Sequence, residues 1–581
     1  MISVTKSRSK LAVIADELRG TNVVVEQQLH SNFMSTLALC ISTLHMFYLL
    51  MSVFPYSGFM TMSLIPTLIR ETVGFHAGIL TSSFMFGMAT TSFVWGKVAD
   101  VYGRKFVLLF SLWTSVIFAF LFGTSVTFTW ALATRFLMGL GNGTIVIART
   151  SISELSYGNR EIEAKNMGLL MSMVGYGMLL GPALGGTLSE PLQQYPQLAE
   201  KLGGVNGDRG SSYLFYVLTD FPFILPNLLA SIFGVLTIIF VTLCVEETLP
   251  EENRRAVYHV VPDLIAWFFH LTINMWKGLC KGHFLTEKTS GRCCQCQADV
   301  NDCTILDLSD KTELSELLSS SSSRQSYNTA KQRPFLIPQV YKKQIKEDAT
   351  IFSMLSVKLI RDHLVAYWLC AFSSVAASEA FPLFAMAHIG GLGFSESEIG
   401  AVGTASGVIF CIFQYIIFAS MNKRFGVHKT MMYGCFLGNA PIILYPFALL
   451  LPKWAALSFL SFLNGSLSLF KTIFSAGVTV ATNRLVTTTD RAKLNGLASL
   501  GASISRATAP IVAGTLVQFS FSANLFPAKW GSVFIYPVLT TIAIFSYRLA
   551  MHLPEEILPE EGMTTLSQKD METAAVEDIS N

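Results

Sequence analysis

Long apolar runs, separated by short polar links, make up most of this chain. A helix needs about 20 apolar residues to cross a bilayer, and we find about twelve runs of suitable length. They begin near Met34, Ala77, Phe106, Phe128, Met167, Phe221, Leu364, Val402, Thr430, Trp454, Leu497 and Val533. The pattern predicts an all-α membrane protein with about twelve transmembrane helices.

A long polar stretch divides these runs into two groups of about six. We expect a cytosolic tail at 1–33, a six-helix half at 34–246, a loop at 247–356, a second half at 357–551 and an acidic tail at 552–581. In the loop, aromatic residues and lysines over 263–282 predict a helix lying in the membrane interface, and the polar part beyond it predicts disorder.

The two halves resemble repeats of each other. The segment Ala164-Lys-Asn-Met-Gly168 matches Ala492-Lys-Leu-Asn-Gly496, and Gly181-Pro182-x-x-Gly185-Gly186 recurs at the same offset as Ala509-Pro510-x-x-Ala513-Gly514. Gly103 has a counterpart in Gly426, although Lys423 and Val427 stand where the first copy has Asp100 and Arg104. Parallel halves related by an axis along the membrane normal predict a binding site between them, near the midplane.

Composition and charge agree with this picture. Of 581 residues, 51% are hydrophobic and 14% charged, and the mean hydropathy is +0.49, far above the range of soluble domains. The net charge of +2 is not gathered into a patch that would bind nucleic acid. Lysine and arginine concentrate in alternate short links, which predicts that both termini and the central loop are cytosolic, whether in the plasma membrane or an organelle membrane.

The link from Gly96 to Lys105 combines an acid, a turn glycine and two cations. Gly103 permits a tight reversal, Arg104 and Lys105 anchor at the phosphate level, and Asp100 is available to pair across the two halves. Making and breaking that pair predicts a two-state cytoplasmic gate. The alternative is an ordinary basic loop.

A ladder of small residues follows in the fifth apolar run. Gly168, Gly177, Gly181, Gly185 and Gly186 recur at helical spacings, and Pro182 interrupts the hydrogen bonding between them. Such a ladder lets a neighbouring backbone approach closely while the proline bends the helix. Simple helix packing would produce the same pattern.

Polar residues inside apolar runs are functional candidates, because an unpaired charge in a bilayer is costly. Glu379 is the strongest proton-carrier candidate, since burial favours the neutral form of a carboxyl, and Arg135 is the strongest cation. His45, Lys471 and Asn142 are further candidates for the proton or substrate site. Each of the five has a structural alternative, such as a hydrogen bond to a neighbouring helix.

The central loop contains several cysteines, but their spacing argues against a metal site. Cys293 and Cys294 are adjacent, and no pair of C-x-x-C knuckles occurs, so we expect no bound metal there. Cysteines after an interfacial helix are often palmitoylated instead. The group comprises Cys280, His283, Cys293, Cys294, Cys296 and Cys303.

These motifs carry a family resemblance. The pattern G-x-x-x-D-x-x-G-R-K at Gly96, the spacing Arg135-x-x-x-Gly139-x-Gly141 and the ladder resemble the drug/proton antiporter branch of the major facilitator superfamily. Gly74-Phe-His-Ala-Gly78, Ser378-Glu379 and Gly393-Phe-Ser look like its zinc-induced facilitator-like group. The resemblance implies that the ladder is the antiporter motif and that Arg135 acts near the proton or substrate.

We therefore expect a secondary active transporter, acting as a monomer without a cofactor, that exports a small organic solute in exchange for protons. The sequence contains no P-loop, HExxH or GxSxG motif, which argues against an enzyme or an ATP-driven pump. A proton-coupled uptake carrier or a uniporter is an alternative of the same class. A membrane sensor or scaffold that transports nothing is the alternative of another class.

Overall fold

The computed structural model describes residues 33–156, 160–202, 213–249, 254–255, 351–485, 491–522 and 533–553. These ranges belong to one compact unit, and their regular structure is helical throughout. We call 33–249 the first half and 351–553 the second half. The expected interfacial helix, the cysteine group of the central loop and both tails lie outside the described residues.

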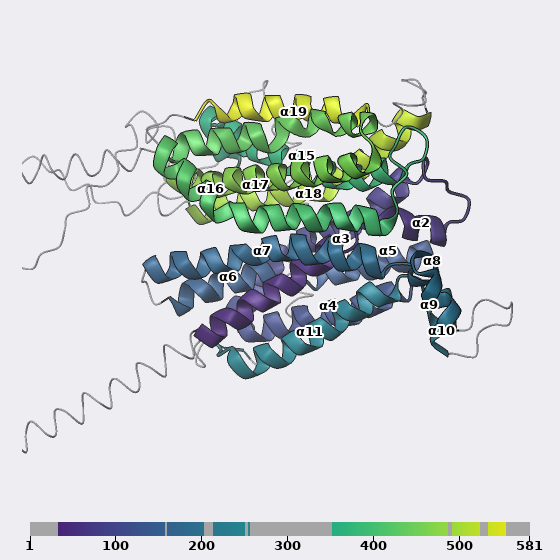
Figure 1. The fold of residues 1–581 in the computed structure, drawn as a ribbon. Coiled ribbons are helices and arrows are strands. Elements are labelled where there is room, and N and C mark those ends of the chain that lie inside the picture. Colours follow the sequence, from purple (N-terminus) through teal and green to yellow (C-terminus); the bar gives the residue numbers. More distant parts are fainter. Residues whose placement is uncertain are drawn as a thin grey trace, which may run out of the picture. The chain divides into compact units, whose positions relative to one another are not determined.

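The first half begins with a helix at Phe33–Met51, which spans the length of a bilayer. Its other helices are α2 (Ser57–Leu64), α3 (Gly74–Tyr102), α4 (Arg104–Gly123), α5 (Phe128–Leu140), α6 (Thr144–Leu155), α7 (Arg160–Leu188), α8 (Pro191–Gln194), α9 (Pro196–Lys201), α10 (Tyr213–Asp220) and α11 (Ile224–Cys244). Figure 1 labels them in purple to teal.

The second half, in green to yellow in Figure 1, repeats the plan. It contains α14 (Ile351–Ser356), α15 (Lys358–Met386), α16 (Glu396–Asn439), the 3-10 helix η3 (Ala440–Leu450), α17 (Lys453–Leu485), α18 (Arg491–Ser522) and α19 (Ile535–Ala550). Together, α16 and η3 make two spans, Glu396–Gln414 and His428–Leu450.

Ten helices in the described residues are long and apolar enough to cross a membrane. An eleventh span is α3, if its bent segments Gly74–Thr91 and Val94–Tyr102 count as one, and α19 is a shorter apolar helix. Each predicted start lies within a helix or, at Phe221 and Val533, just before one. The predicted fold class is confirmed.

The two turn glycines that we matched by sequence have the same backbone character. Gly103 has φ of 109° between α3 and α4, and Gly426 has φ of 74° at the kink inside α16. Both angles lie in the region that residues with a Cβ rarely adopt. The same tight reversal therefore occurs once in each half.

Two helix pairs make most of the contacts between the halves among the described residues: α3 packs on α18, and α7 packs on α16. We call these pairs the two seams. In each, a proline of one helix lies against a glycine of the other, since a Cβ on Gly78 would overlap the carbonyl of Pro510, and one on Gly403 would overlap the Pro182 ring. The repeated Gly/Pro pattern thus lies at equivalent positions in the two seams.

The seams differ between their two ends. We call the end that carries Arg104 and Lys105 the basic end, and the other the opposite end. At the opposite end, Gly74 and Gly514 are so close that a Cβ on either would strike the backbone of the other. At the basic end, a Cβ on Gly168 or Gly496 would meet no heavy atom of the described residues within 4 Å. Glycines of the seams thus contact the other half at the opposite end, whereas these two have open space beside them at the basic end.

Candidate functional site

Arg135 lies deep in the first half, although it is a cation in an apolar helix. Its residue is 1% exposed, and its guanidinium lies between the rings of Phe84 and Phe122, 5.1 and 5.2 Å from their centroids. One nitrogen donates to the carbonyl of Leu49 at 3.4 Å, while Nε has no hydrogen-bond partner. Two aromatic faces therefore stabilise the charge, since their negative quadrupoles attract cations.

Glu379 lies on α15 in the second half and is fully buried. Neither oxygen of its carboxyl has a hydrogen-bond partner among the described residues. Ala376, Ala377 and Ala380 surround it on the same helix and are buried as well. Burial makes the charged form of such a carboxyl costly, and Thr81 and Arg135 offset that cost in part.

Arg135 and Glu379 attract each other across the boundary between the halves. They do not form a contact ion pair, because no nitrogen–oxygen distance between them is 4.0 Å or less. Thr81 of α3 lies next to the Glu379 carboxyl, and Tyr56 lies near Arg135. The Nδ2 group of Asn227 donates to the Tyr56 hydroxyl at 3.2 Å. The candidate proton acceptor and the buried cation thus lie within electrostatic range of each other, on opposite halves.

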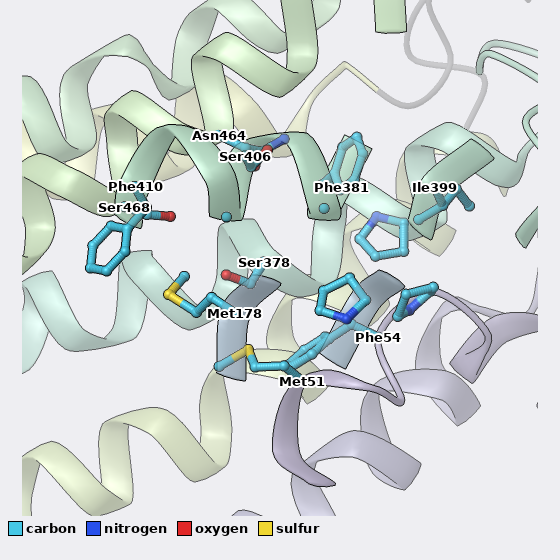
Figure 2. Close-up of a pocket in the computed structure, with 15 residues that line it drawn as sticks. Met51, Phe54, Met178, Ser378, Phe381, Ile399, Ser406, Phe410, Asn464 and Ser468 are labelled. Carbon is cyan, nitrogen blue, oxygen red and sulfur yellow. The ribbon is translucent and has the colours of Figure 1, made fainter. Parts of the chain in front are cut away.

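A pocket between the halves is lined by residues of both, and it includes Ser378, the residue before Glu379. It holds about 630 Å³ of empty space, part of it open to solvent. Figure 2 shows its lining side chains, with Ser378 next to Glu379 in sequence. The lining consists of Met51, Phe54, Pro55, Met178, Pro182, Ser378, Phe381, Pro382, Ile399, Gly403, Ser406, Gly407, Phe410, Asn464 and Ser468.

The chemistry of this pocket is apolar, with a few polar groups. None of its lining residues is charged, and Ser378, Ser406, Asn464 and Ser468 supply the polar atoms. The Asn464 side chain is occupied, since it accepts from Tyr445 and donates to the Leu460 carbonyl. Such a lining suits the apolar part of an organic solute.

The glycine ladder borders both the pocket and the first helix. Gly177, Gly181 and Gly185 face Phe47, Met51 and Ser52, where a Cβ would not fit. Gly186 faces Gly400 of α16, and Pro182 lines the pocket itself. The ladder therefore permits two close approaches, one inside the first half and one across a seam.

His45 does not join this site. Its Nε2 donates to the Ala230 carbonyl at 3.1 Å, and its ring packs edge-on against Phe233. Both partners lie on α11, so the structure supports the alternative of a helix-to-helix hydrogen bond.

Asn142 and Lys471 also lie apart from the Arg135–Glu379 pair. The Asn142 side chain accepts from the Thr144 N–H at 3.3 Å, while its Nδ2 is buried without a partner. Lys471 lies on α17, where Gly438 leaves room for its backbone and stem, and its charge interacts with the Cys370 thiol.

The expected gate residues form a network inside the first half. Arg104 pairs with Glu154 at 2.6 Å and with Asp100 at 3.2 Å. In this arrangement Asp100 pairs within the first half, and its pairing across the halves stays a prediction for a state in which the basic end is closed. With Arg104 one helical turn away, the acid pairs locally, and 68% of its side chain is exposed.

Sequence reasoning missed the acid that organises this link. Glu247 accepts hydrogen bonds from the backbone N–H groups of Arg104 and Lys105, at 2.8 and 3.0 Å. It thereby caps the start of α4, where unpaired N–H groups attract a carboxylate. The spacing from Glu247 to Gly103 is too long for any local motif to reveal this contact.

Comparison with known proteins identifies the family. The sequence profile of the Major Facilitator Superfamily matches residues 47–257 and 364–568. The chain belongs to this superfamily. The predicted resemblance is confirmed, since relatives include the Zinc Induced Facilitator-Like 1 protein of Arabidopsis thaliana, 26% identical over 81% of this chain and 80% of that protein.

Two other relatives have similar coverage. A probable peptide/nitrate transporter of Arabidopsis thaliana is 25% identical over 85% of this chain and 84% of its own length. The multidrug transporter mfsB of Aspergillus fumigatus is 25% identical over 85% of this chain and 80% of its own.

Solved structures share the fold. A D-xylose–proton symporter aligns with a TM-score of 0.56 at 14% identity, covering 91% of this chain and 98% of its own. A bacterial homologue of the lysosomal transporter Spinster, in an inward-facing state, aligns with a TM-score of 0.55 at 14% identity, covering 90% and 98%. This superfamily chain is thus an integral multi-pass membrane protein of the transporter fold.

Proposed function

We propose that the protein is a secondary active transporter that exports a small organic solute in exchange for protons. Its relatives include transporters described as multidrug and as efflux proteins. The solute binds in the pocket between the halves, and the halves rock about it. With the basic end in the cytosol, as the distribution of cations suggests, the present arrangement is open toward the cytosol.

The observation that carries proton coupling is the buried carboxyl of Glu379. Among the described residues it has no hydrogen-bond partner within 3.5 Å, although Thr81 lies close enough to stabilise its charge. It lies within electrostatic range of Arg135 on the other half, and it directly follows Ser378 of the pocket lining. Losing the proton strengthens its attraction to Arg135, and gaining one weakens it. Protonation of Glu379 therefore changes the attraction between the two halves, and a solute bound between the halves is coupled to it in this way.

The test is Glu379→Gln, which fixes the neutral form. A thermal-shift screen first identifies a solute, because a ligand that binds the folded state raises its stability. In liposomes with purified protein, we expect exchange of that solute to persist while the stimulation by a pH gradient is lost. Arg135→Ala should weaken both the exchange and its stimulation by the gradient, because the charge of Arg135 acts on Glu379 and on a solute in the pocket.

Glu398→Gln is the matched control, since this acid is partly exposed at the start of α16 and forms an ion pair with Lys453 at 2.7 Å. Full gradient-driven stimulation in Glu379→Gln would place the proton elsewhere. In the wild type, flux that no gradient affects would indicate a uniporter, and inward accumulation driven by protons an uptake carrier. Absence of flux for every bound solute would favour a sensor or scaffold.

A further inference from the structure

Three cations approach one face of α15 from three other helices. Arg149 lies on α6 in the first half, whereas Arg506 and Lys471 lie on α18 and α17 in the second. Arg506 donates to the Tyr367 hydroxyl at 3.3 Å, and Arg149 interacts electrostatically with both of them. Arg506 and Lys471 both act on the thiol of Cys370, one turn after Tyr367. We call Arg149, Arg506 and Lys471 the cation cluster.

The cluster contains no balancing acid. Among the described residues, none of the three cations forms an ion pair with a carboxylate, and the hydrogen bond of Arg149 goes to the sulfur of Met171 at 3.7 Å. Arg149 and Arg506 even repel each other across the boundary between the halves. Cations between membrane helices are usually paired or wet. Arg149 is exposed, and Arg506 and Lys471 are half-buried, so this cluster has capacity for an anion.

The cluster is reachable from the basic end. Arg149 is an exposed residue, six positions before α6 ends, which corresponds to about 9 Å of helix. Gly168 on α7 and Gly496 on α18 have open space beside them at this end. A solute that enters between the halves therefore meets the cluster before it reaches the pocket.

The cluster and the pocket lie along the same helix. Cys370 precedes Ser378 of the pocket lining by eight residues, which places them about 12 Å apart along α15. The pocket itself contributes no charged side chain. A molecule with an apolar body and a terminal anionic group matches this division.

We propose that the cation cluster binds the anionic group of the transported solute, and that the solute is an amphipathic organic anion with a carboxylate, sulfonate or phosphate. This inference rests on the proposed transport function and adds the charge of the substrate. Two arginine side chains suit the task, because their planar donors match the oxygens of such groups.

Binding of this kind also explains how the solute promotes closure. Arg149 and Arg506 belong to different halves, so their repulsion opposes approach of the halves at the basic end. An anion between them replaces repulsion with two attractions. The occupied state thus favours closure at the basic end more than the empty state does.

The test compares two dyes with the same ring system and opposite charge: fluorescein, an anion, and rhodamine 123, a cation. Binding to purified protein is measured by fluorescence anisotropy without a proton gradient. We expect fluorescein to bind more tightly than rhodamine 123. Arg149→Gln and Arg506→Gln should each weaken fluorescein binding at least about tenfold, since each removes a charge-assisted contact. Arg548→Gln, on the exposed last turn of α19, is the matched control.

A second measurement does not depend on any dye fitting the pocket. Ser374→Cys, one turn after Cys370, is placed in a chain whose ten native cysteines are replaced. We measure the rates at which this cysteine reacts with an anionic (sulfonate) and a cationic (trimethylammonium) methanethiosulfonate, each divided by the rate for a free thiol. We expect the anionic reagent to react faster. Each cation removed should lower that ratio by about threefold, as expected for charges about 7 Å apart in water-like surroundings.

The outcomes are distinct from those of the proton test. Tighter binding of rhodamine 123, or unchanged fluorescein binding in both arginine variants, overturns the proposal, and so does an equal rate for the two reagents. The assays use phosphatidylcholine alone, and then with phosphatidylglycerol. Loss of the reagent preference only when the anionic lipid is present would assign the cluster to a lipid headgroup and overturn the proposal. Failure of the Glu379→Gln test alone leaves these readouts unaffected.

Discussion

The two ends of the seams use the same residue type in opposite ways. At the opposite end, Gly74 contacts Gly514 and Gly186 contacts Gly400, so closely that no side chain would fit. At the basic end of the same helices, Gly96, Gly168 and Gly496 have no neighbour among the described residues within 4 Å of the Cβ position. The difference predicts that the halves meet at these glycines in a second state, in which the basic end is closed.

The largest expected effect is at the opposite end. Gly514→Val would place a side chain against the backbone of Gly74, 2.7 Å from its carbonyl carbon, where nothing flexible can yield. We expect this end to remain open and transport to fall by more than about tenfold, equivalent to at least about 1.4 kcal/mol. Labelling of Ala77→Cys, which is fully buried in the closed seam, measures the opening.

The matched control is Gly496→Val on the same helix α18. It should leave Ala77→Cys protected, because nothing contacts Gly496 in this arrangement, and yet slow transport by obstructing closure of the basic end. Equal labelling of Ala77→Cys in both variants would contradict the distinction between the two ends.

A smaller effect is expected from the link at the basic end. Arg104→Ala removes a largely buried cation that pairs with Glu154, and should lower stability by about 1 to 2 kcal/mol and slow transport severalfold. Asp100→Asn should lower stability by less than about 0.5 kcal/mol, because the Asp100 side chain is mostly exposed. Thermal unfolding and flux at equal protein level measure both. If Asp100→Asn lost more stability than Arg104→Ala, the predicted order of the two variants would be wrong.

The smallest expected effect concerns pH at the opposite end. Burial and the neighbouring carboxyl of Glu396 raise the pKa of Glu190 from 4.5 to about 8, and Arg70 offsets this in part. Glu190 keeps its proton in the closed seam and loses it when exposed at an ordinary pKa. Closure therefore weakens as pH rises from about 5 to about 8 and changes little above that.

Labelling of Ala77→Cys at several pH values, normalised to an exposed cysteine, tests this. We expect labelling to rise with pH in the wild type and to depend less on pH in Glu190→Gln, where the carboxyl of Glu396 remains. Other charges near this end are Glu71, which accepts from the Ile389 N–H, and the Lys453–Glu398 pair, and both remain in the variant. An unchanged pH profile in Glu190→Gln would exclude this acid as the titrating group.

Much of the architecture was predictable because its signals are local. Apolar runs mark the starts of the helices, and the turn glycines Gly103 and Gly426 match because a tight reversal requires φ values that only glycine adopts readily. The ladder at Gly181 and its copy at Ala509 predicted close approach, and helices do approach there. The family also follows from such motifs, since they recur at fixed spacing.

The site was predictable only as a set of candidates. Arg135 and Glu379 stand out as charges in apolar runs, but the aromatic faces of Phe84 and Phe122 around Arg135 depend on helix rotations that spacing does not reveal. His45 looks equally functional in sequence and is satisfied by Ala230 in the structure. The contact of Glu247 with the link also joins distant segments, so no local pattern contains it.

The 3-10 helix η3 has a consequence for the length of the ninth span. Its eleven residues, Ala440–Leu450, include Pro441 and Pro446 and rise about 2.0 Å each, whereas an α-helix rises about 1.5 Å. The stretched segment therefore covers about 5 Å more of the bilayer than an α-helix of equal length, which is close to one helical turn. A span of 23 residues, His428–Leu450, thus gains reach without gaining residues. Rewinding part of η3 would draw the start of α17 inward by a fraction of that distance, so the second half contains an adjustable length next to the helix that carries Lys471.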